Sequence, residues 1–140
     1  MQTRDCEGLT SARAVWDFMT ADSRRFLDRV RLMLLAMRRF REQDIKPDFV
    51  VLLHAGATKF AARDLTGTKF AADDVKDFPE IHSALADFTS QGGRVEVCGI
   101  AMDRSLIGRA ALMPYAEIEE NVFLNSIALQ NRGYAYVLVS

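Results

Sequence analysis

The sequence predicts a three-layer α/β/α domain built on a five-stranded, mainly parallel sheet. Segments typical of strands alternate with segments typical of helices, and this alternation favours parallel strands joined by right-handed crossovers. The run at 48–53, Asp-Phe-Val-Val-Leu-Leu, is continuously apolar after its first residue, as expected of a strand covered on both faces. The chain has 140 residues, 49% of them hydrophobic and 26% charged, which suits one globular domain with a single core.

The first half of the chain begins with an expected strand and a long expected helix. The strand covers Ala12–Met19, which is rich in bulky apolar residues although Asp17 interrupts it. The helix covers Ala21–Glu42, where apolar residues recur at helical spacing. Asp22 or Ser23 is its expected N-cap. The buried strand at 48–53 follows.

A long segment without clear periodicity, Ala55–Phe78, separates that strand from the next helix. It contains a near-repeat, TKFAARD at 58–64 and TKFAADD at 68–74. One such echo is too short for a repeat protein. We therefore expect two short helical turns, hinged at Thr66 and Gly67.

The second half continues the alternation of helices and strands. Its expected elements are, in order, a helix over Pro79–Gln91, a strand over Arg94–Ile100, a short helix over Ser105–Leu112, a weak strand over Tyr115–Glu119, a helix over Val122–Asn131 capped by Asn121, and a strand over Tyr134–Val139. Residues 1–11 are expected to form an N-terminal tail, and residues 12–140 the single domain.

Composition argues against several classes of protein. The net charge is -1, so no overall positive charge attracts nucleic acid or anionic membranes. No apolar stretch approaches the roughly 20 residues that span a bilayer, and the N-terminus lacks the apolar region of a secretory signal. The chain has only two cysteines, which make no disulfide framework. We expect a cytoplasmic protein that binds neither nucleic acid nor membranes.

Two reactive side chains stand at the carboxyl ends of expected strands, where ligands gather in parallel sheets. His54 follows the second strand and can act as a general base or satisfy itself on backbone groups. Gly56 beside it lets backbone or ligand approach closely. Cys98 lies near the end of the third strand, and the segment after Gly99 could start a helix whose amides, with Arg104, would lower the thiol pKa. An inert, buried cysteine is the alternative.

Neither a metal nor a cofactor is predicted. His54, His82 and Cys98 are far apart in the sequence, whereas structural zinc usually needs four clustered ligands. Residues 20–23, after the first strand, contain no glycine-rich phosphate loop of the kind that binds dinucleotides. We expect His82 on the surface and Cys6 exposed in a poorly ordered tail.

Residues 98–104, Cys-Gly-Ile-Ala-Met-Asp-Arg, resemble the C-G-x-C-M-D-x-R-G stretch of the DsrE/DsrF-like family, which includes the YchN-like branch. LLHAGATKFAA at 52–62 is similar to that family's loop after the second strand. LQNRGYAYVLV at 129–139 is similar to its closing element. The resemblance covers about residues 12–139.

This resemblance implies a small sulfur-handling protein that assembles as a homotrimer or homohexamer. In the sulfur-relay members, one cysteine after the third strand carries sulfur as a persulfide, and Cys98 occupies that place. Its expected supporting residues are His54, Gly56, Gly99, Asp103 and Arg104. The motif's second cysteine is Ala101 here, so a dithiol cycle is ruled out, and its final glycine is replaced by Ser105.

The leading hypothesis is a persulfide carrier or sulfurtransferase-like protein that uses Cys98. The missing second cysteine favours a rival, a non-catalytic oligomeric module with the same fold. A protein that binds a small ligand or flavin is the third hypothesis. Leu32 and Leu35 widen the apolar stripe of the 21–42 helix, which indicates a contact between subunits.

Overall fold

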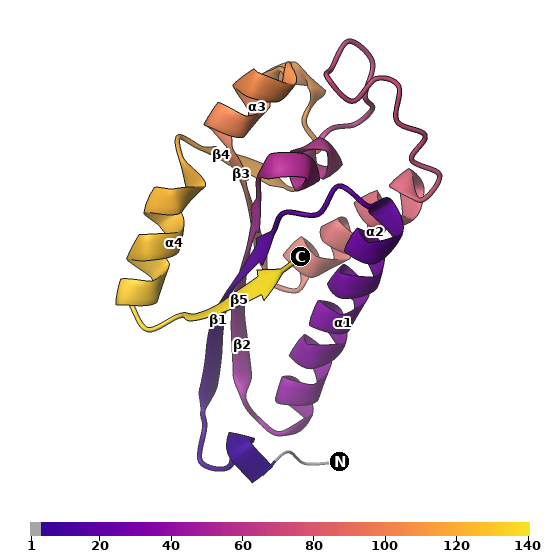
Figure 1. The fold of residues 1–140 in the computed structure, drawn as a ribbon. Coiled ribbons are helices and arrows are strands. Elements are labelled where there is room, and N and C mark those ends of the chain that lie inside the picture. Colours follow the sequence, from indigo (N-terminus) through magenta and orange to yellow (C-terminus); the bar gives the residue numbers. More distant parts are fainter. Residues whose placement is uncertain (1–3) are drawn as a thin grey trace.

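A sheet of five strands separates two helical layers in the computed structural model, which describes residues 4–140 (Figure 1). The strand order is β4-β3-β2-β1-β5, and every neighbouring pair is parallel, so the sheet expected to be mainly parallel is wholly parallel. The strands are β1 (Ser11–Phe18), β2 (Lys46–Leu53), β3 (Arg94–Cys98), β4 (Ala116–Glu119) and β5 (Ala135–Val139).

The helices divide between the two faces of the sheet and its carboxyl edge. Helices α1 (Ser23–Glu42) and α2 (Phe78–Ser90) cover one face, α4 (Val122–Asn131) lies on the other, and α3 (Gly99–Ser105) lies beyond the end of β3 (Figure 1). Of the two expected caps of α1, Asp22 takes the role: its carboxylate accepts the Arg25 N–H at 3.0 Å. No helix within residues 4–140 is long and apolar enough to cross a membrane.

The two faces of the sheet are unequally covered. The large core lies under α1 and α2, where six phenylalanine, methionine and leucine side chains are almost or fully inaccessible: Phe26, Met33, Met37, Phe49, Leu85 and Phe88. The core under α4 is small, comprising Val15, Val50, Leu52, Cys98, Val122 and Leu129. The α4 face is therefore thinly covered.

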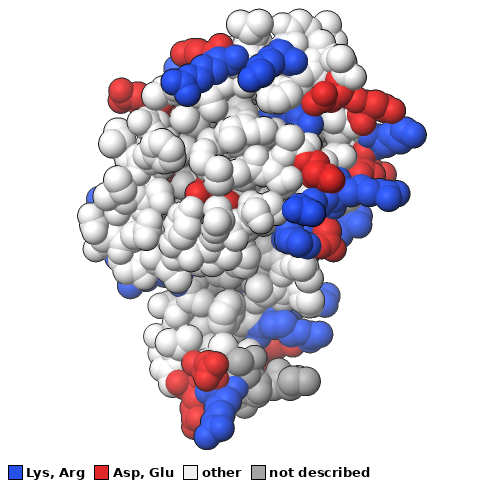
Figure 2. Space-filling view, in the orientation of Figure 1, with Lys and Arg blue, Asp and Glu red and all other residues white. Residues whose placement is uncertain are grey.

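Large apolar side chains remain exposed on this thinly covered side. They come from α4 and β5: Phe123, Leu124, Ile127, Tyr136 and Leu138, which we call the α4/β5 patch. In Figure 2 the surface over α4 and β5 is mostly free of charged side chains, which gather elsewhere on the visible face. Monomeric proteins rarely leave large apolar patches uncovered.

The chain passes from strand to helix earlier than the sequence predicts. β3 ends at Cys98 and α3 begins at Gly99, so the strand expected over Arg94–Ile100 is too long. The helix expected over Ser105–Leu112 is wrong, because Leu106 adopts the left-handed conformation (φ 60) and ends α3. A non-glycine residue in that conformation cannot continue a right-handed helix.

The near-repeat does not form two equivalent helical turns. Its first copy lies mainly in η2, a 3-10 helix over Ala55–Ala61, whereas its second copy contains turns and irregular backbone but no helix. The hydroxyl of Thr68 donates to the Leu65 carbonyl at 2.8 Å and accepts the Phe70 N–H at 3.1 Å. Such local side-chain bonds compete with helix formation, and this explains why the second expected turn is wrong.

The N-terminal segment is more ordered than expected. Arg4–Cys6 form the short 3-10 helix η1, and Cys6 is half-buried instead of exposed. β1 begins at Ser11, one residue before the expected start of the domain. The expected tail also includes residues 1–3, which lie outside the described residues.

Candidate functional site

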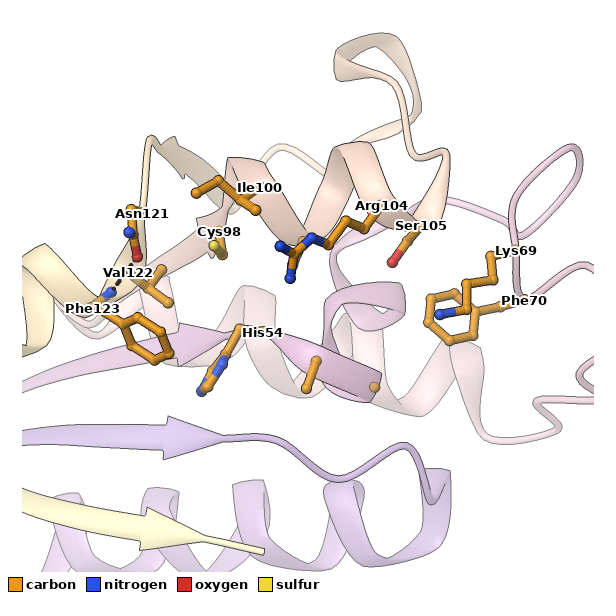
Figure 3. Close-up of a pocket in the computed structure, with 13 residues that line it drawn as sticks. His54, Lys69, Phe70, Cys98, Ile100, Arg104, Ser105, Asn121, Val122 and Phe123 are labelled. Carbon is orange, nitrogen blue, oxygen red and sulfur yellow. Dashed lines mark hydrogen bonds between the residues drawn. The ribbon is translucent and has the colours of Figure 1, made fainter.

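A cavity of about 590 Å³ opens at the carboxyl ends of β2 and β3 (Figure 3). Cys98 and His54 both line it, which confirms that they lie at the same edge of the sheet. Its walls come from η2, α3, the start of α4 and the turns around residues 69–70. Segments far apart in the sequence thus meet around these two side chains.

Cys98 is the last residue of β3 and the N-cap residue of α3. It pairs with Glu119 of β4 in the sheet register. Reactive cysteines are usually partly exposed. The Cys98 side chain, in contrast, packs in the small core under α4, and the residue is only 7% exposed. Cys98 also lines the cavity, so the cavity gives access to this residue (Figure 3).

His54 is held by a carboxylate that the sequence did not associate with it. Its Nε2 bonds one oxygen of Asp17, and the hydroxyl of Tyr136 donates to the other. The three side chains come from β1, β5 and the residue after β2. An ionised carboxylate can only accept, so the Nε2 of His54 carries the hydrogen and its Nδ1 is the nitrogen able to take a proton.

Burial by itself would raise the pKa of the Asp17 carboxyl. The hydrogen bonds from His54 and Tyr136, together with the charge of His54, outweigh burial and hold that pKa below its ordinary value. Burial and the bond to Asp17 raise the pKa of Tyr136 to about 12. Asp17 is therefore the ionised, accepting centre of this cluster at neutral pH.

Two cationic side chains reach the cavity, and only one of them was expected. Arg104 of α3 points into the space between Cys98 and Lys69 in the view of Figure 3. Lys69 belongs to the second copy of the near-repeat. Within residues 4–140 neither side chain has an ion-pair partner, and no aspartate or glutamate lines this cavity. The described cavity is therefore cationic at neutral pH.

The two predicted glycines permit close approaches between backbone segments. A Cβ on Gly56 would lie 2.5 Å from the Cβ of Ala21, which shows that a protein segment, not a ligand, fills that space. A Cβ on Gly99 would lie 3.1 Å from the Glu119 carbonyl oxygen. Gly56 lines the cavity, whereas Gly99 does not.

Asp103 lies apart from the cavity that contains Cys98. Together with Gly99 it lines a second hollow of about 410 Å³, which also involves Arg109 and Glu120. The structure therefore brings Cys98, His54, Gly56 and Arg104 together, but not Asp103 and Gly99. The proximity of Asp103 to Cys98 in the sequence does not extend to the cavity wall.

His82 is not the surface residue that the sequence suggested. Its Nε2 lies 2.8 Å from the Ala62 carbonyl oxygen, and burial lowers its pKa although that hydrogen bond raises it. Within residues 4–140, no group of three or more histidine, cysteine, aspartate or glutamate side chains is arranged to hold a metal ion.

A second buried carboxyl lies on β3, two residues before Cys98 and therefore on the same face of the strand. Glu96 is only 5% exposed, and its Oε1 has no hydrogen-bond partner among the described residues. Burial raises the pKa of Glu96, Arg94 opposes this, and the neighbouring Glu119 and Glu117 raise it further. This carboxyl is costly to ionise in the folded protein.

Sequence reasoning missed Asp17, Tyr136, Lys69 and Glu96. For Asp17 and Glu96 the available signal was an acidic residue inside an otherwise apolar strand, since buried carboxylates need specific partners or shifted pKa values. Lys69 and Tyr136 gave no such signal, because lysine in a loop and tyrosine in a strand are common.

Solved structures that share this fold include two that cover nearly the whole chain. The protein of unknown function MTH1491 from Methanobacterium thermoautotrophicum superposes with a TM-score of 0.72 at 16% identity, over 91% of this chain and 98% of that one. The ychN protein from E. coli superposes with a TM-score of 0.60 at 17% identity, over 91% of this chain and 97% of that one. At such identities the likeness concerns the fold alone.

Comparison of sequences gives information beyond the shared fold. An uncharacterized protein of Aquifex aeolicus (strain VF5) is 29% identical over 130 residues, which are 89% of this chain but 55% of that protein. The chain thus spans about half the length of this curated relative. The sequence model of the DsrE/DsrF-like family, which is associated with sulfur relay, matches residues 18–138. The chain belongs to the DsrE/DsrF-like family.

Proposed function

We propose that this protein is a persulfide carrier, with sulfurtransferase-like activity, in which Cys98 holds the sulfur. The observation that carries the proposal is the position of Cys98 in a cavity at the carboxyl edge of a parallel sheet, beside His54 and Arg104. This edge is where parallel α/β proteins bind their ligands. Membership of a family associated with sulfur relay supports the same reading.

The transfer is a displacement at sulfur and needs no external oxidant. The Cys98 thiolate attacks the outer sulfur of a donor persulfide, R–S–SH, and the S–S bond of the donor breaks. The donor leaves as R–S⁻ with the bonding electron pair, and Cys98 becomes Cys98–S–SH. The reverse displacement by an acceptor thiolate delivers the sulfur and restores the Cys98 thiolate.

His54 supplies the proton acceptor in this proposal. Asp17 holds its Nε2–H, so Nδ1 is the nitrogen that takes the thiol proton of Cys98, through water. Arg104 lines the same cavity and favours negative charge on the sulfur. Because Ala101 replaces the second cysteine of the family motif, the sulfur stays on one residue instead of passing through an internal disulfide.

Mass spectrometry of the intact protein after incubation with a persulfide donor tests this function. We expect a gain of one sulfur atom that maps to Cys98 and disappears on reduction. Cys98→Ser should abolish the gain. Cys6→Ser is the matched control, since Cys6 is the other free cysteine, and it should load like the wild type. Absence of loading in the wild type would reject the carrier function.

The low exposure of Cys98 favours one alternative, a non-catalytic module that keeps the fold without sulfur chemistry. In that case Cys98 fills the small core under α4. Alkylation rates separate the two functions: a carrier thiol should react faster than an unstructured cysteine across about pH 6–9, whereas a core thiol should react more slowly.

We also propose that the protein is a homo-oligomer, a trimer or hexamer, in the cytoplasm. The exposed α4/β5 patch and the exposed Leu32 of α1 are the apolar surfaces that a second copy would cover. A cytoplasmic location agrees with the two free cysteines, which persist in a reducing compartment.

A further inference from the structure

The charges of the Cys98 cavity are all of one sign. Arg104 and Lys69 line it from two different segments, and no acidic side chain of the described residues does. Neither cation forms an ion pair within the described part of the chain, residues 4–140. A hollow lined by charges of one sign raises the local concentration of ions of the opposite sign, so these two cations attract an anion.

Lys69 is brought to the cavity by specific contacts. Its backbone N–H donates to the Ser105 carbonyl at 2.9 Å, which ties the second copy of the near-repeat to the end of α3. Further along that copy, Asp73 accepts a hydrogen bond from the buried ammonium of Lys59 at 2.9 Å. Lys59 occupies the same position in the first copy as Lys69 in the second. Lys59 bonds Asp73 and so holds the second copy in place, whereas Lys69 lines the cavity.

The rest of the lining is largely apolar. Phe70, Ile100, Val122 and Phe123 surround the space beside the two cations. An inorganic anion would leave these side chains uncovered, whereas an organic anion would place its charge on the cations and its body on the apolar wall. A volume of about 590 Å³ accommodates a molecule of that size.

We propose that the cavity binds a low-molecular-weight persulfide donor that carries a carboxylate. This proposal rests on the function proposed above and names the class of its substrate. The carboxylate binds between Arg104 and Lys69, and the outer sulfur reaches the Cys98 thiolate. The donor's S–S bond breaks, its thiolate leaves with the electron pair, and no further reagent is consumed. A thiol that is only 7% exposed suits a small donor that enters the cavity.

A binding experiment tests the anion site without any sulfur transfer. The Cys98→Ser protein is titrated at low salt with S-methyl-N-acetylcysteine and, separately, with the uncharged amide of the same compound, and binding is followed by NMR. We expect the carboxylate to bind about tenfold more tightly than the amide, because a charge-assisted hydrogen bond is lost with the charge. The preference should shrink as salt screens the cations.

Substitutions test which side chains cause the preference for the carboxylate over the amide. Arg104→Gln and Lys69→Gln, each added to the Cys98→Ser protein, should bring the two affinities close together. Arg109→Gln and Lys76→Gln remove equal charges from exposed positions outside the cavity and should retain the preference. Equal affinities in the parent protein, or a preference that survives loss of both cavity cations, would overturn the anion site.

Loading rates then connect the site to transfer. N-acetylcysteine persulfide should load the wild-type Cys98 about tenfold faster than the persulfide of the uncharged amide at low salt. If neither donor loads Cys98 while the carboxylate preference persists in the binding experiment, the carrier function fails and the anion site stands. If both donors load equally and the thioethers bind equally, the carrier function stands and the anion site is rejected.

Discussion

The carboxylate of Asp17 orients the ring of His54 and accepts a hydrogen bond from the Tyr136 hydroxyl. A carboxylate with 7% exposure is tolerated only because donors satisfy both of its oxygens. The polar cluster therefore depends on Asp17 being ionised.

Replacing Asp17 with asparagine should lower the free energy of unfolding by about 1–2 kcal/mol at neutral pH, since the amide cannot accept from both donors through two oxygens. The folded-state pKa of Asp17 lies below the ordinary 3.8, so its contribution is present above that pH and is lost as the pH falls through the folded-state value. Urea denaturation should show the difference from wild type shrinking toward pH ~2. A constant difference would contradict this role.

Tyr136→Phe is the matched control for that substitution. It removes one donor and leaves the bond between His54 and Asp17, so the expected loss is smaller, about 0.5–1 kcal/mol. A larger loss than that of Asp17→Asn would mean that the tyrosine hydroxyl, not the carboxylate, organises the cluster.

Glu96 should behave in the opposite sense. The folded-state pKa of Glu96 lies above the ordinary 4.5. The stability that the protonated Glu96 side chain contributes is therefore fully present below pH 4.5 and is lost as the pH rises through the folded-state pKa. Glu96→Gln should therefore raise the free energy of unfolding by about 1 kcal/mol at pH ~8 and leave it unchanged near pH ~4. The exposed Glu117→Gln should change it by less than about 0.5 kcal/mol at either pH. Equal effects of Glu96→Gln at both pH values would refute this interpretation.

Some site residues could be predicted from the sequence and others could not, for physical reasons. Cys98 and His54 could be placed at one edge because the carboxyl ends of parallel strands share that edge. Asp17 could not be paired with His54, because their contact depends on β1 lying beside β2 in register. Tyr136 could not be added, because its contact with Asp17 depends on β5 lying beside β1 across more than a hundred residues. Asp103 was expected to support Cys98 because it belongs to the same family motif, yet it lines the second hollow.

At the scale of elements, the order of strands and helices followed from hydrophobic periodicity, whereas several boundaries did not. The end of β3 was placed two residues too late, because Gly99 and Ile100 continue an apolar pattern that does not distinguish a strand from the first turn of a helix. The second copy of the near-repeat was expected to form a helical turn. The hydrogen bonds of the Thr68 hydroxyl favour turns there instead.

The link between Lys59 and Asp73 fastens the segment that carries Lys69. Asp73→Asn leaves a buried ammonium without its counter-ion and should lower the free energy of unfolding by about 1–2 kcal/mol. Lys59→Met keeps the length of the side chain and removes the charge, so it should cost less. Chemical denaturation of the two variants checks this ranking, and the reverse ranking would mean that Lys59 acts chiefly through its aliphatic part.

The close approach at Gly56 gives a prediction about the wall of the cavity. Gly56→Ala should lower the free energy of unfolding by about 1–3 kcal/mol, since the new Cβ would lie 2.5 Å from the Cβ of Ala21. Gly108→Ala introduces the same methyl group where no atom of the described residues lies within 4 Å, and it should have little effect. Thermal denaturation compares them, and equal melting temperatures for both variants would show that the loop after β1 yields easily.

For the whole molecule, we expect light scattering to report a mass three or six times the 15.7 kDa of one chain. A monomer at micromolar concentration would contradict the proposed assembly.

Charged substitutions identify the contact surface: Ile127→Glu tests the α4/β5 patch, and Leu32→Glu tests the outer side of α1. We expect Ile127→Glu to dissociate the oligomer, because its patch is the broader apolar surface, and burying an unpaired carboxylate there is costly. Dissociation by Leu32→Glu alone would assign the contact to α1.

The strand order has a consequence for biosynthesis. β1 is made first, yet one of its two neighbours in the sheet is β5, the last strand along the chain. Until residues 135–139 have left the ribosome, the nascent β1 keeps an open edge that can pair with other chains. Tyr136 belongs to β5, so the Asp17 carboxylate has no bond from the Tyr136 hydroxyl until β5 has been synthesised. Ribosome-bound chains that stop before β5 would therefore hold an incomplete polar cluster and an aggregation-prone edge, and these would be the states that chaperones need to protect.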